Sequence, residues 1–107
     1  MTADAQIMVD GNLTLEVVPK LFEEGLVRLD EGALRVDFSQ VEAVDSSAIS
    51  MLLGWERAAQ QKQNELSVTG LPDDLLSLAR LYGVEELLPN TLPIFPGPEY
   101  FERYSHE

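Results

Sequence analysis

Three consecutive polar residues hold the chain's best-placed reactive groups. Asp45, Ser46 and Ser47 follow an alternating apolar stretch and directly precede a stretch with helical apolar spacing. At a helix start, such side-chain oxygens accept bonds from amide N–H groups that the first turn leaves unpaired, which makes the residues a helix cap. The helix macrodipole also favours negative charge there, so a serine could carry a phosphate or contact a phosphate-handling partner. Both interpretations stay open on spacing alone.

The surroundings of these serines do not supply a catalytic constellation. A serine nucleophile needs a base and an orienting group, but no Lys, His or Cys lies near Ser46 or Ser47, and there is no Gly-x-Ser-x-Gly elbow. Asp37 and Asp45 could be read as an acid/base or Mg²⁺ pair, yet no P-loop glycine run or Ca²⁺ loop accompanies them. We therefore expect a binding and regulatory protein, with a small enzyme as the contrasting hypothesis.

Cysteine and histidine chemistry are also missing from the sequence. The chain has no cysteine, which excludes disulfides, thiolate catalysis and cysteine-bound metals. Its one histidine, His106, is the penultimate residue, and a chain end is a poor place for a general base or metal ligand. We expect no catalytic residue, no metal site and no cofactor.

The charge balance narrows the class of partner. With 19 acidic and 7 basic residues the net charge is -12, which repels nucleic acid and the anionic membrane surface and favours a basic protein surface. The same acidity also serves solubility alone. No apolar run reaches the roughly 18 residues that span a bilayer, and the first residues lack a secretory signal pattern. We expect a cytoplasmic protein without direct nucleic-acid binding or membrane insertion.

The 107 residues correspond to a single domain. Residues 7–9 and 13–15 alternate on either side of Asp10-Gly11-Asn12, which predicts a tight antiparallel hairpin. Helical spacing predicts a helix over residues 17–30, in which Gly25 brings the helix close to the sheet. A strand with one buried face follows over residues 33–38.

A long helix is expected to begin after Asp45 and to fade near Asn64. Its Trp55 is either a core residue or an exposed docking aromatic, and we favour burial. A strand starting at Leu66 and a helix starting at Pro72 and ending at Gly83 complete the pattern, with a short helical turn over residues 84–88. The predicted core consists of Ile7, Val9, Leu13, Leu15, Leu21, Phe22, Leu26, Leu34, Val36, Phe38, Ile49, Leu52, Leu53, Leu66, Val68, Leu75, Leu78 and Leu81.

Beyond residue 88 the composition changes. Four prolines predict an extended chain over residues 89–98. The four aromatic residues of this tail cover either their own domain or a partner, including a second copy in a homodimer; they are Phe95, Tyr100, Phe101 and Tyr104.

Several stretches together resemble the STAS domain, named for sulfate transporters and anti-sigma factor antagonists. They are Val36–Ser39, Val44–Ser47 opening an apolar helix, Leu66–Pro72 and Leu78–Leu88. The resemblance covers residues 6–88, between an N-terminal tail over residues 1–5 and the C-terminal tail over residues 89–107. It implies an α/β fold, a mixed sheet of about four to five strands that begins with the antiparallel hairpin and carries three to four helices.

The resemblance implies two candidate functions, both centred on the corner formed by Asp45, Ser46, Ser47 and Ala48. In anti-sigma factor antagonists this corner reads Asp-Ser-Ser-Gly-x-Gly, and the second serine, here Ser47, is phosphorylated by an anti-sigma factor kinase. Ala48 and Ser50 replace the glycines, and we expect their side chains to crowd the surface on which the kinase docks.

Residues 70–88 look more like the small STAS subunit of the bacterial lipid-asymmetry ABC transporter. In that subunit the first hydroxyl residue, here Ser46, matters for docking on the ATPase. The preferred hypothesis is therefore a non-enzymatic subunit that binds and regulates the cytoplasmic ATPase of a phospholipid-transporting ABC complex, and so lies peripheral to the inner membrane. The alternative is an anti-sigma factor antagonist controlled by serine phosphorylation.

Overall fold

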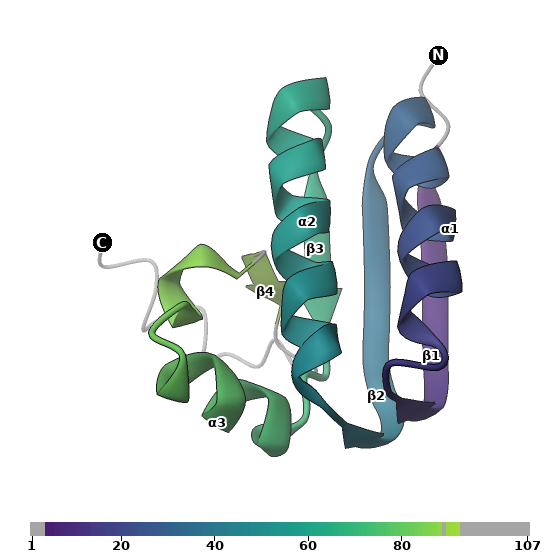
Figure 1. Cartoon of the computed structure of the whole chain (residues 1–107). Helices are drawn as coiled ribbons and strands as arrows, with labels where there is room; N and C mark the ends of the chain where they lie inside the picture. Colours follow the sequence, from purple (N-terminus) through teal and green to yellow (C-terminus); the bar gives the residue numbers. More distant parts are fainter. Residues whose placement is uncertain (1–3, 89, 93–107) are drawn as a thin grey trace, which may run out of the picture.

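Strands and helices alternate along the chain, as the change between period-2 and helical apolar spacing predicts. The structure is a computed structural model that describes residues 4–88 and the backbone of residues 90–92. In chain order its elements (Figure 1) are β1 (Ala5–Leu13), α1 (Val18–Glu31), β2 (Leu34–Val44), α2 (Ser46–Lys62), β3 (Leu66–Thr69), α3 (Asp73–Leu81), the 3₁₀ turn η1 (Glu85–Leu87) and β4 (Asn90–Leu92).

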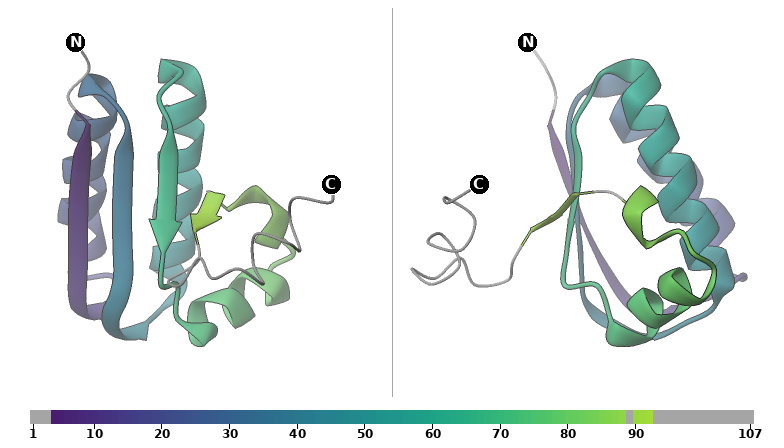
Figure 2. Two further views of the ribbon diagram at one scale, coloured as in Figure 1. Left: turned by 180° about the vertical axis from the view of Figure 1, so that it is seen from behind. Right: turned by 90° about the vertical axis from the view of Figure 1, so that its left-hand side faces the viewer.

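The strands form one sheet in the order β1-β2-β3-β4, and all neighbouring pairs are parallel. Parallel neighbours need a long crossover connection, and α1, α2 and α3 supply one between each pair of successive strands. Figure 2 shows all three helices on the same face of the sheet. The predicted C-terminal tail lies outside the described residues, apart from the backbone of β4.

The predicted antiparallel hairpin is wrong, and with it the mixed sheet. Gly11 does adopt a positive φ of 72°, but β1 continues through it instead of turning. The β1–β2 pairing shifts register twice, between Met8 and Asp10 and between Gly11 and Asn12. A glycine with positive φ fits an irregularity within a strand as well as it fits a turn, and the sequence pattern does not separate the two. β2 also continues to Val44, six residues beyond the predicted end of the strand.

The core lies between the sheet and the helices. In β2, Leu34, Val36 and Phe38 are buried while Arg35 is exposed, so one face of the strand points at the helices. Buried residues that the prediction omitted are mostly on helices: Val18, Leu29, Ala48, Met51, Trp55, Ala59 and Ala79.

Two predicted core residues are exposed. Leu15 is 68% exposed because β1 ends at Leu13 and the chain is already turning toward α1. Leu81 is 76% exposed. It lies two residues after the buried Ala79, about 200° around the helix, and therefore on the outer face of α3.

The α1–α2 contact is built around Trp55. Its side chain is 0% exposed, and the indole Nε1–H donates to the Phe22 carbonyl oxygen at 3.0 Å. A Cβ atom on Gly25 would stand 2.3 Å from the indole ring. Gly25 therefore permits close approach of α1 to Trp55 on α2, and not to the sheet as the sequence suggested.

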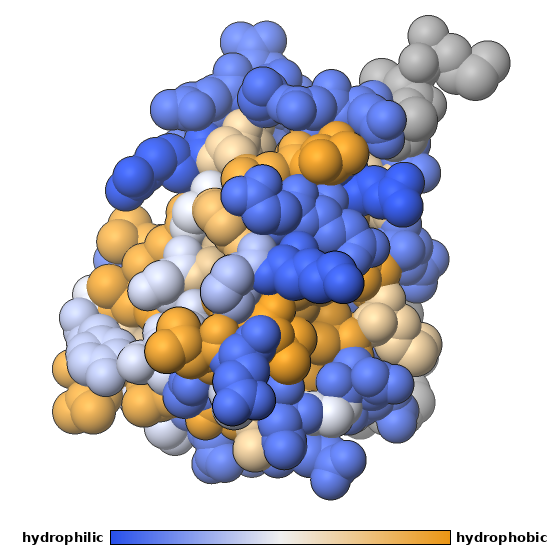
Figure 3. Space-filling view, turned by 45° about the vertical axis from the view of Figure 1, so that its right-hand side comes forward, coloured by the Kyte–Doolittle hydropathy of each residue, from blue (hydrophilic) through white to orange (hydrophobic). Residues whose placement is uncertain are grey.

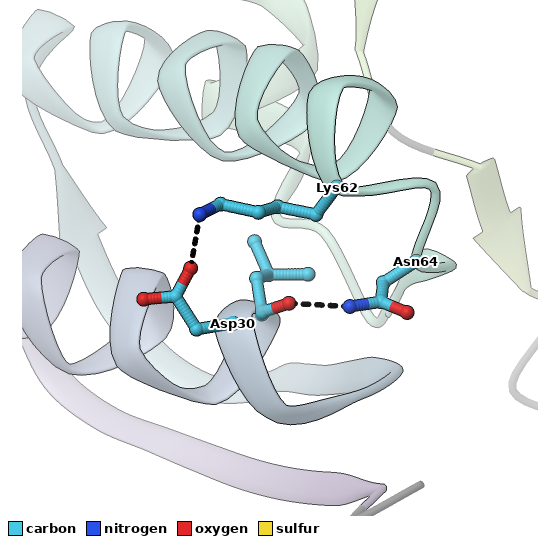
Figure 4. Close-up of polar contacts among 4 residues, drawn as sticks. Asp30, Lys62 and Asn64 are labelled. Carbon is cyan, nitrogen blue, oxygen red and sulfur yellow. Dashed lines mark hydrogen bonds and ion pairs between the residues drawn. The ribbon is translucent and has the colours of Figure 1, made fainter.

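A second set of contacts joins the C-terminal ends of α1 and α2 (Figure 4). The Asn64 amide donates to the carbonyl oxygen of Leu29 at 2.6 Å, which satisfies one of the carbonyls that a helix end leaves unpaired. Lys62 also pairs with Asp30, but both side chains are about half exposed, and exposed ion pairs stabilise little. The two helices are thus held together at the end remote from the start of α2.

Among the described residues, no helix combines the length and the apolar composition needed to cross a bilayer.

The packing of Trp55 on Gly25 predicts a large effect of a single methyl group. We expect Gly25→Ala to lower the free energy of unfolding by about 1 to 3 kcal/mol, because the added Cβ overlaps a ring that has no free space to move into. Gly54→Ala is the matched control, and we expect a smaller loss, because its Cβ would meet the outer edge of a half-buried ring, that of Phe22, at 2.7 Å. Urea denaturation followed by circular dichroism measures both; equal or greater stability of Gly25→Ala would contradict the packing.

Candidate functional site

The corner lies where β2 ends and α2 begins, at the lower end of α2 in Figure 1. Asp45 is the N-cap residue, with an extended backbone. Its Oδ1 accepts a hydrogen bond from the Ser47 amide at 2.9 Å and another from the Ser47 hydroxyl. Its Oδ2 accepts from the Leu15 amide at 3.0 Å, and its own amide donates to the Leu13 carbonyl at 3.3 Å.

The Asp45 carboxylate therefore connects three segments of the chain: the end of β2, the first turn of α2 and the β1–α1 loop. These bonds also hold the pKa of Asp45 below its usual range, chiefly through the Ser47 hydroxyl, with the amides of Leu15 and Ser47 adding to the effect. The carboxylate is consequently charged at neutral pH, and both of its oxygens are occupied by donors from within the chain.

The structure separates the two serines of the corner. Ser46, the first residue of α2, is exposed, whereas Ser47 is half-buried and its hydroxyl is bound to Asp45. Ala48 is 0% exposed, so its methyl group points into the core and cannot crowd a docking partner, contrary to the expectation. Ser50 is exposed one turn further along α2. The exposed polar part of the first turns is thus formed by Ser46 and Ser50, with Ser47 between them and the core.

Trp55 does not belong to this surface. It is buried between α1 and α2 and has no exposed area to offer a partner. The interpretation of Trp55 as an exposed docking aromatic is therefore not supported by its position, and its polar atom is already bonded to the Phe22 carbonyl.

Asp37 does not cap a helix as Asp45 does, and it accepts hydrogen bonds at a different place. Its Oδ1 accepts from the Ser39 amide at 2.8 Å, a bond that lowers the pKa of Asp37, and bonds from the Ser39 and Thr69 side chains lower it further. Asp37 lies in β2 and Asp45 directly follows that strand, so eight residues of extended chain, roughly 25 Å, separate the two carboxylates. They therefore cannot act as one acid/base pair. In the described part of the chain, no three acidic or histidine side chains cluster as metal ligands.

A groove next to the corner was not predicted from the sequence. It has a volume of about 290 Å³ and lies between the first turns of α1 and α2; its lining consists of Leu15, Val18, Pro19, Phe22, Ser47, Ser50 and Met51. Figure 3 shows apolar residues across the middle and lower part of this side of the molecule, interspersed with hydrophilic residues and bordered by them above and below. The sequence did not indicate the groove, because Leu15 was assigned to a strand and the groove exists only once the two helices are in place.

A second pocket, also of about 290 Å³, lies at the opposite edge of the sheet and does not touch the corner. It is lined by Asp4, Ala5, Gln6, Ala33, Leu34, Arg35, Glu65 and Ser67. This pocket lies at the end of the sheet where the strands begin, whereas the candidate site lies at the end where β2 finishes.

The bonds of Asp45 predict a graded response to substitution. We expect Asp45→Ala to lower the free energy of unfolding by about 1 to 2 kcal/mol through loss of the helix cap. Asp45→Asn should cost less, because one amide oxygen can still accept from Ser47, although it cannot also replace Oδ2 as acceptor for Leu15. Urea denaturation compares the two; equal losses would mean that the acceptor retained for Ser47 contributes nothing to stability.

The lowered pKa values predict how stability depends on pH. A carboxyl group whose pKa is lower in the folded than in the unfolded chain contributes stability above the unfolded value, near 3.9. That contribution is lost as the pH falls through the folded value. Both Asp37 and Asp45 behave this way, so between pH 5 and pH 3 wild type should lose more stability than Asp37→Asn/Asp45→Asn. Parallel pH profiles of the two proteins would contradict this.

Comparisons with known proteins point to one family. A family model described as "Mlab, STAS domain" matches residues 2–89. The anti-sigma-B factor antagonist of Listeria monocytogenes is 29% identical over 89 residues, which cover 81% of this chain and 78% of that protein. The anti-sigma-B factor antagonist of Staphylococcus aureus is 28% identical over 86 residues, covering 78% and 79%.

Solved structures confirm the α/β STAS-like fold. The anti-sigma factor antagonist SpoIIAA in its unphosphorylated form superposes with a TM-score of 0.65 at 13% identity, over 100% of this chain and 96% of that one. The STAS domain of the SulP transporter from Vibrio cholerae gives a TM-score of 0.61 at 14% identity, over 96% and 83%. Identities this low show the fold alone, whereas the family model covers most of the chain: this protein belongs to the STAS family described as Mlab, STAS domain.

Proposed function

We propose that this protein is an anti-sigma factor antagonist, a non-enzymatic module whose corner docks on an anti-sigma factor kinase and whose Ser47 accepts phosphate. The observation that carries the proposal is the bond of the Ser47 hydroxyl to the Asp45 cap. The relatives named as anti-sigma-B factor antagonists support it, since the similarity covers more than three quarters of this chain.

Phosphate on Ser47 would act directly on the cap. Esterification removes the proton that the hydroxyl donates to Asp45 and places nearly two negative charges beside that carboxylate. Asp45 would then be repelled from the first turn of α2, and its bond to the Leu15 amide would be strained or lost. A docking surface formed by the corner would thus change both its charge and its shape.

A second candidate is a regulatory subunit that binds the ATPase of a phospholipid-transporting ABC complex. The resemblance of residues 70–88 to that subunit motivates it, and Ser46 is exposed, which leaves its hydroxyl accessible to a partner. Here the corner is a constant docking surface without a phosphorylation step. Both partners would be cytoplasmic, and only this second one would place the protein beside the inner membrane.

The two candidates predict different roles for neighbouring serines. For an anti-sigma factor antagonist, we expect stoichiometric phosphate on Ser47 in cells, loss of partner binding in Ser47→Asp and constitutive binding in Ser47→Ala. For the ATPase subunit, Ser46→Ala should weaken binding by about 1 to 2 kcal/mol if its hydrogen bond is buried in the complex, and no phosphate should be found.

The measurement combines affinity purification of the full chain from its native cells with mass spectrometry of the partner and of the corner peptide. The affinity of the purified partner is then measured for Ser46→Ala, Ser47→Ala and Ser47→Asp. Recovery of an ABC ATPase together with unmodified Ser47 would overturn the first candidate, and recovery of an anti-sigma factor kinase without an ATPase would overturn the second. The circular dichroism spectra of all variants serve as the control for folding.

A further inference from the structure

The apolar groove between α1 and α2 has no task in the docking described so far. Leu15 is 68% exposed at its mouth, and Val18, Pro19, Phe22 and Met51 contribute further apolar lining. A large exposed leucine beside an apolar hollow is the arrangement that receives a side chain from a partner, since fully desolvated apolar contacts carry much of the binding energy of protein interfaces.

The groove and the corner share residues and bonds. Ser47 lines the groove and also donates its hydroxyl to Asp45. Leu15 lines the groove on the opposite side, and its amide donates to the second oxygen of the same carboxylate. A partner docked on the corner therefore lies over the mouth of the groove. Modification of Ser47 would affect Leu15, a lining residue of the groove, because both residues bond to the Asp45 carboxylate.

Charge indicates what kind of side chain fits. Glu16, Lys20 and Glu23 directly follow the groove residues Leu15, Pro19 and Phe22, and all three are exposed, so these neighbours carry a net charge of -1. The first two turns of α2, residues 46–53, carry no charged residue, and the chain as a whole has a net charge of -12. The surroundings of the groove are therefore acidic on the α1 side and neutral on the α2 side, which complements a basic protein surface.

We infer that the groove receives an apolar side chain presented by a basic surface of the same protein partner that docks on the corner. The inference rests on the proposed function for the existence of that partner, but either candidate partner satisfies it. The groove supplies the apolar contact, and Glu16 and Glu23 supply electrostatic attraction to the basic surface of the partner. The corner supplies the Ser47 hydroxyl, which can be modified.

Photo-cross-linking in cells tests the location of the partner. The photoreactive residue p-benzoylphenylalanine is placed in the full-length protein at Leu15, at Ser46 and, as a control, at Val27. Val27 is 55% exposed on α1 and lies two and a half turns after the groove residue Val18, on the opposite face of the helix. We expect the probes at Leu15 and Ser46 to capture the same protein and the probe at Val27 to capture none.

The outcomes separate the groove from the proposed function. Capture by Ser46 but not by Leu15 would overturn the groove and leave the proposed function standing. Capture by neither would overturn both. Capture of a second copy of this chain at Leu15 would show that the groove serves self-association, which also overturns the inference.

The protein captured at Ser46 is then purified and used for binding measurements. We expect Leu15→Ser to weaken its binding about 10- to 30-fold, as truncation at the centre of an interface does, and Val27→Ser to leave it unchanged. Glu16→Lys should slow association and reduce its dependence on salt, whereas Glu31→Lys, at the far end of α1, should not. Equal binding by Leu15→Ser and Val27→Ser, with both variants folded, would overturn the inference.

Discussion

The Asp45 carboxylate is the interaction on which the arrangement of the site depends. It caps α2 through Ser47 and holds the β1–α1 loop through the Leu15 amide. Without it, the start of α2 and the β1–α1 loop would lose the side-chain hydrogen bonds that join them. Because a helix start leaves amide groups unpaired, one charged acceptor with two oxygens can cap α2 and also bind an amide of the β1–α1 loop, and the candidate site is built on that junction.

The same two helices are locked further along by Trp55. The indole ring fills the space that Gly25 leaves on α1, and its N–H bonds a carbonyl of that helix. Asn64 repeats this kind of side-chain to backbone contact at the other end of the pair. The α1–α2 pair is therefore held together at its middle and at its C-terminal end, and the groove lies at the opposite end, where both helices begin.

The buried and the exposed residues of α2 lie on different faces of the helix. Ala48, Met51, Leu52 and Trp55 face the core, while Ser46 and Ser50 face solvent. The exposed residues of the first turns are small and polar, and residues 46–53 carry no charge. Substitution or modification of the exposed residues should therefore leave the packing of the buried face of α2 intact. Ser47 is the exception, because its hydroxyl bonds to Asp45, which caps the helix.

The sequence by itself determined the parts that depend on local patterns. Alternation over Leu34–Phe38 predicted a strand with one buried face, helical spacing predicted α1, α2 and α3, and the Asp-Ser-Ser pattern predicted the cap, because periodicity and capping are properties of neighbouring residues. Only the tertiary structure decided that Gly11 continues a strand, since a positive φ suits a bulge and a turn equally.

Tertiary structure also decided the roles of Ala48 and Leu15, whereas the sequence already favoured burial of Trp55. Whether a residue near a helix start faces the core or a partner depends on where the next helix packs, and no local pattern contains that information. The groove is the clearest case: its walls come from the β1–α1 loop, α1 and α2, and it exists because Asp45 and Trp55 bring those segments together.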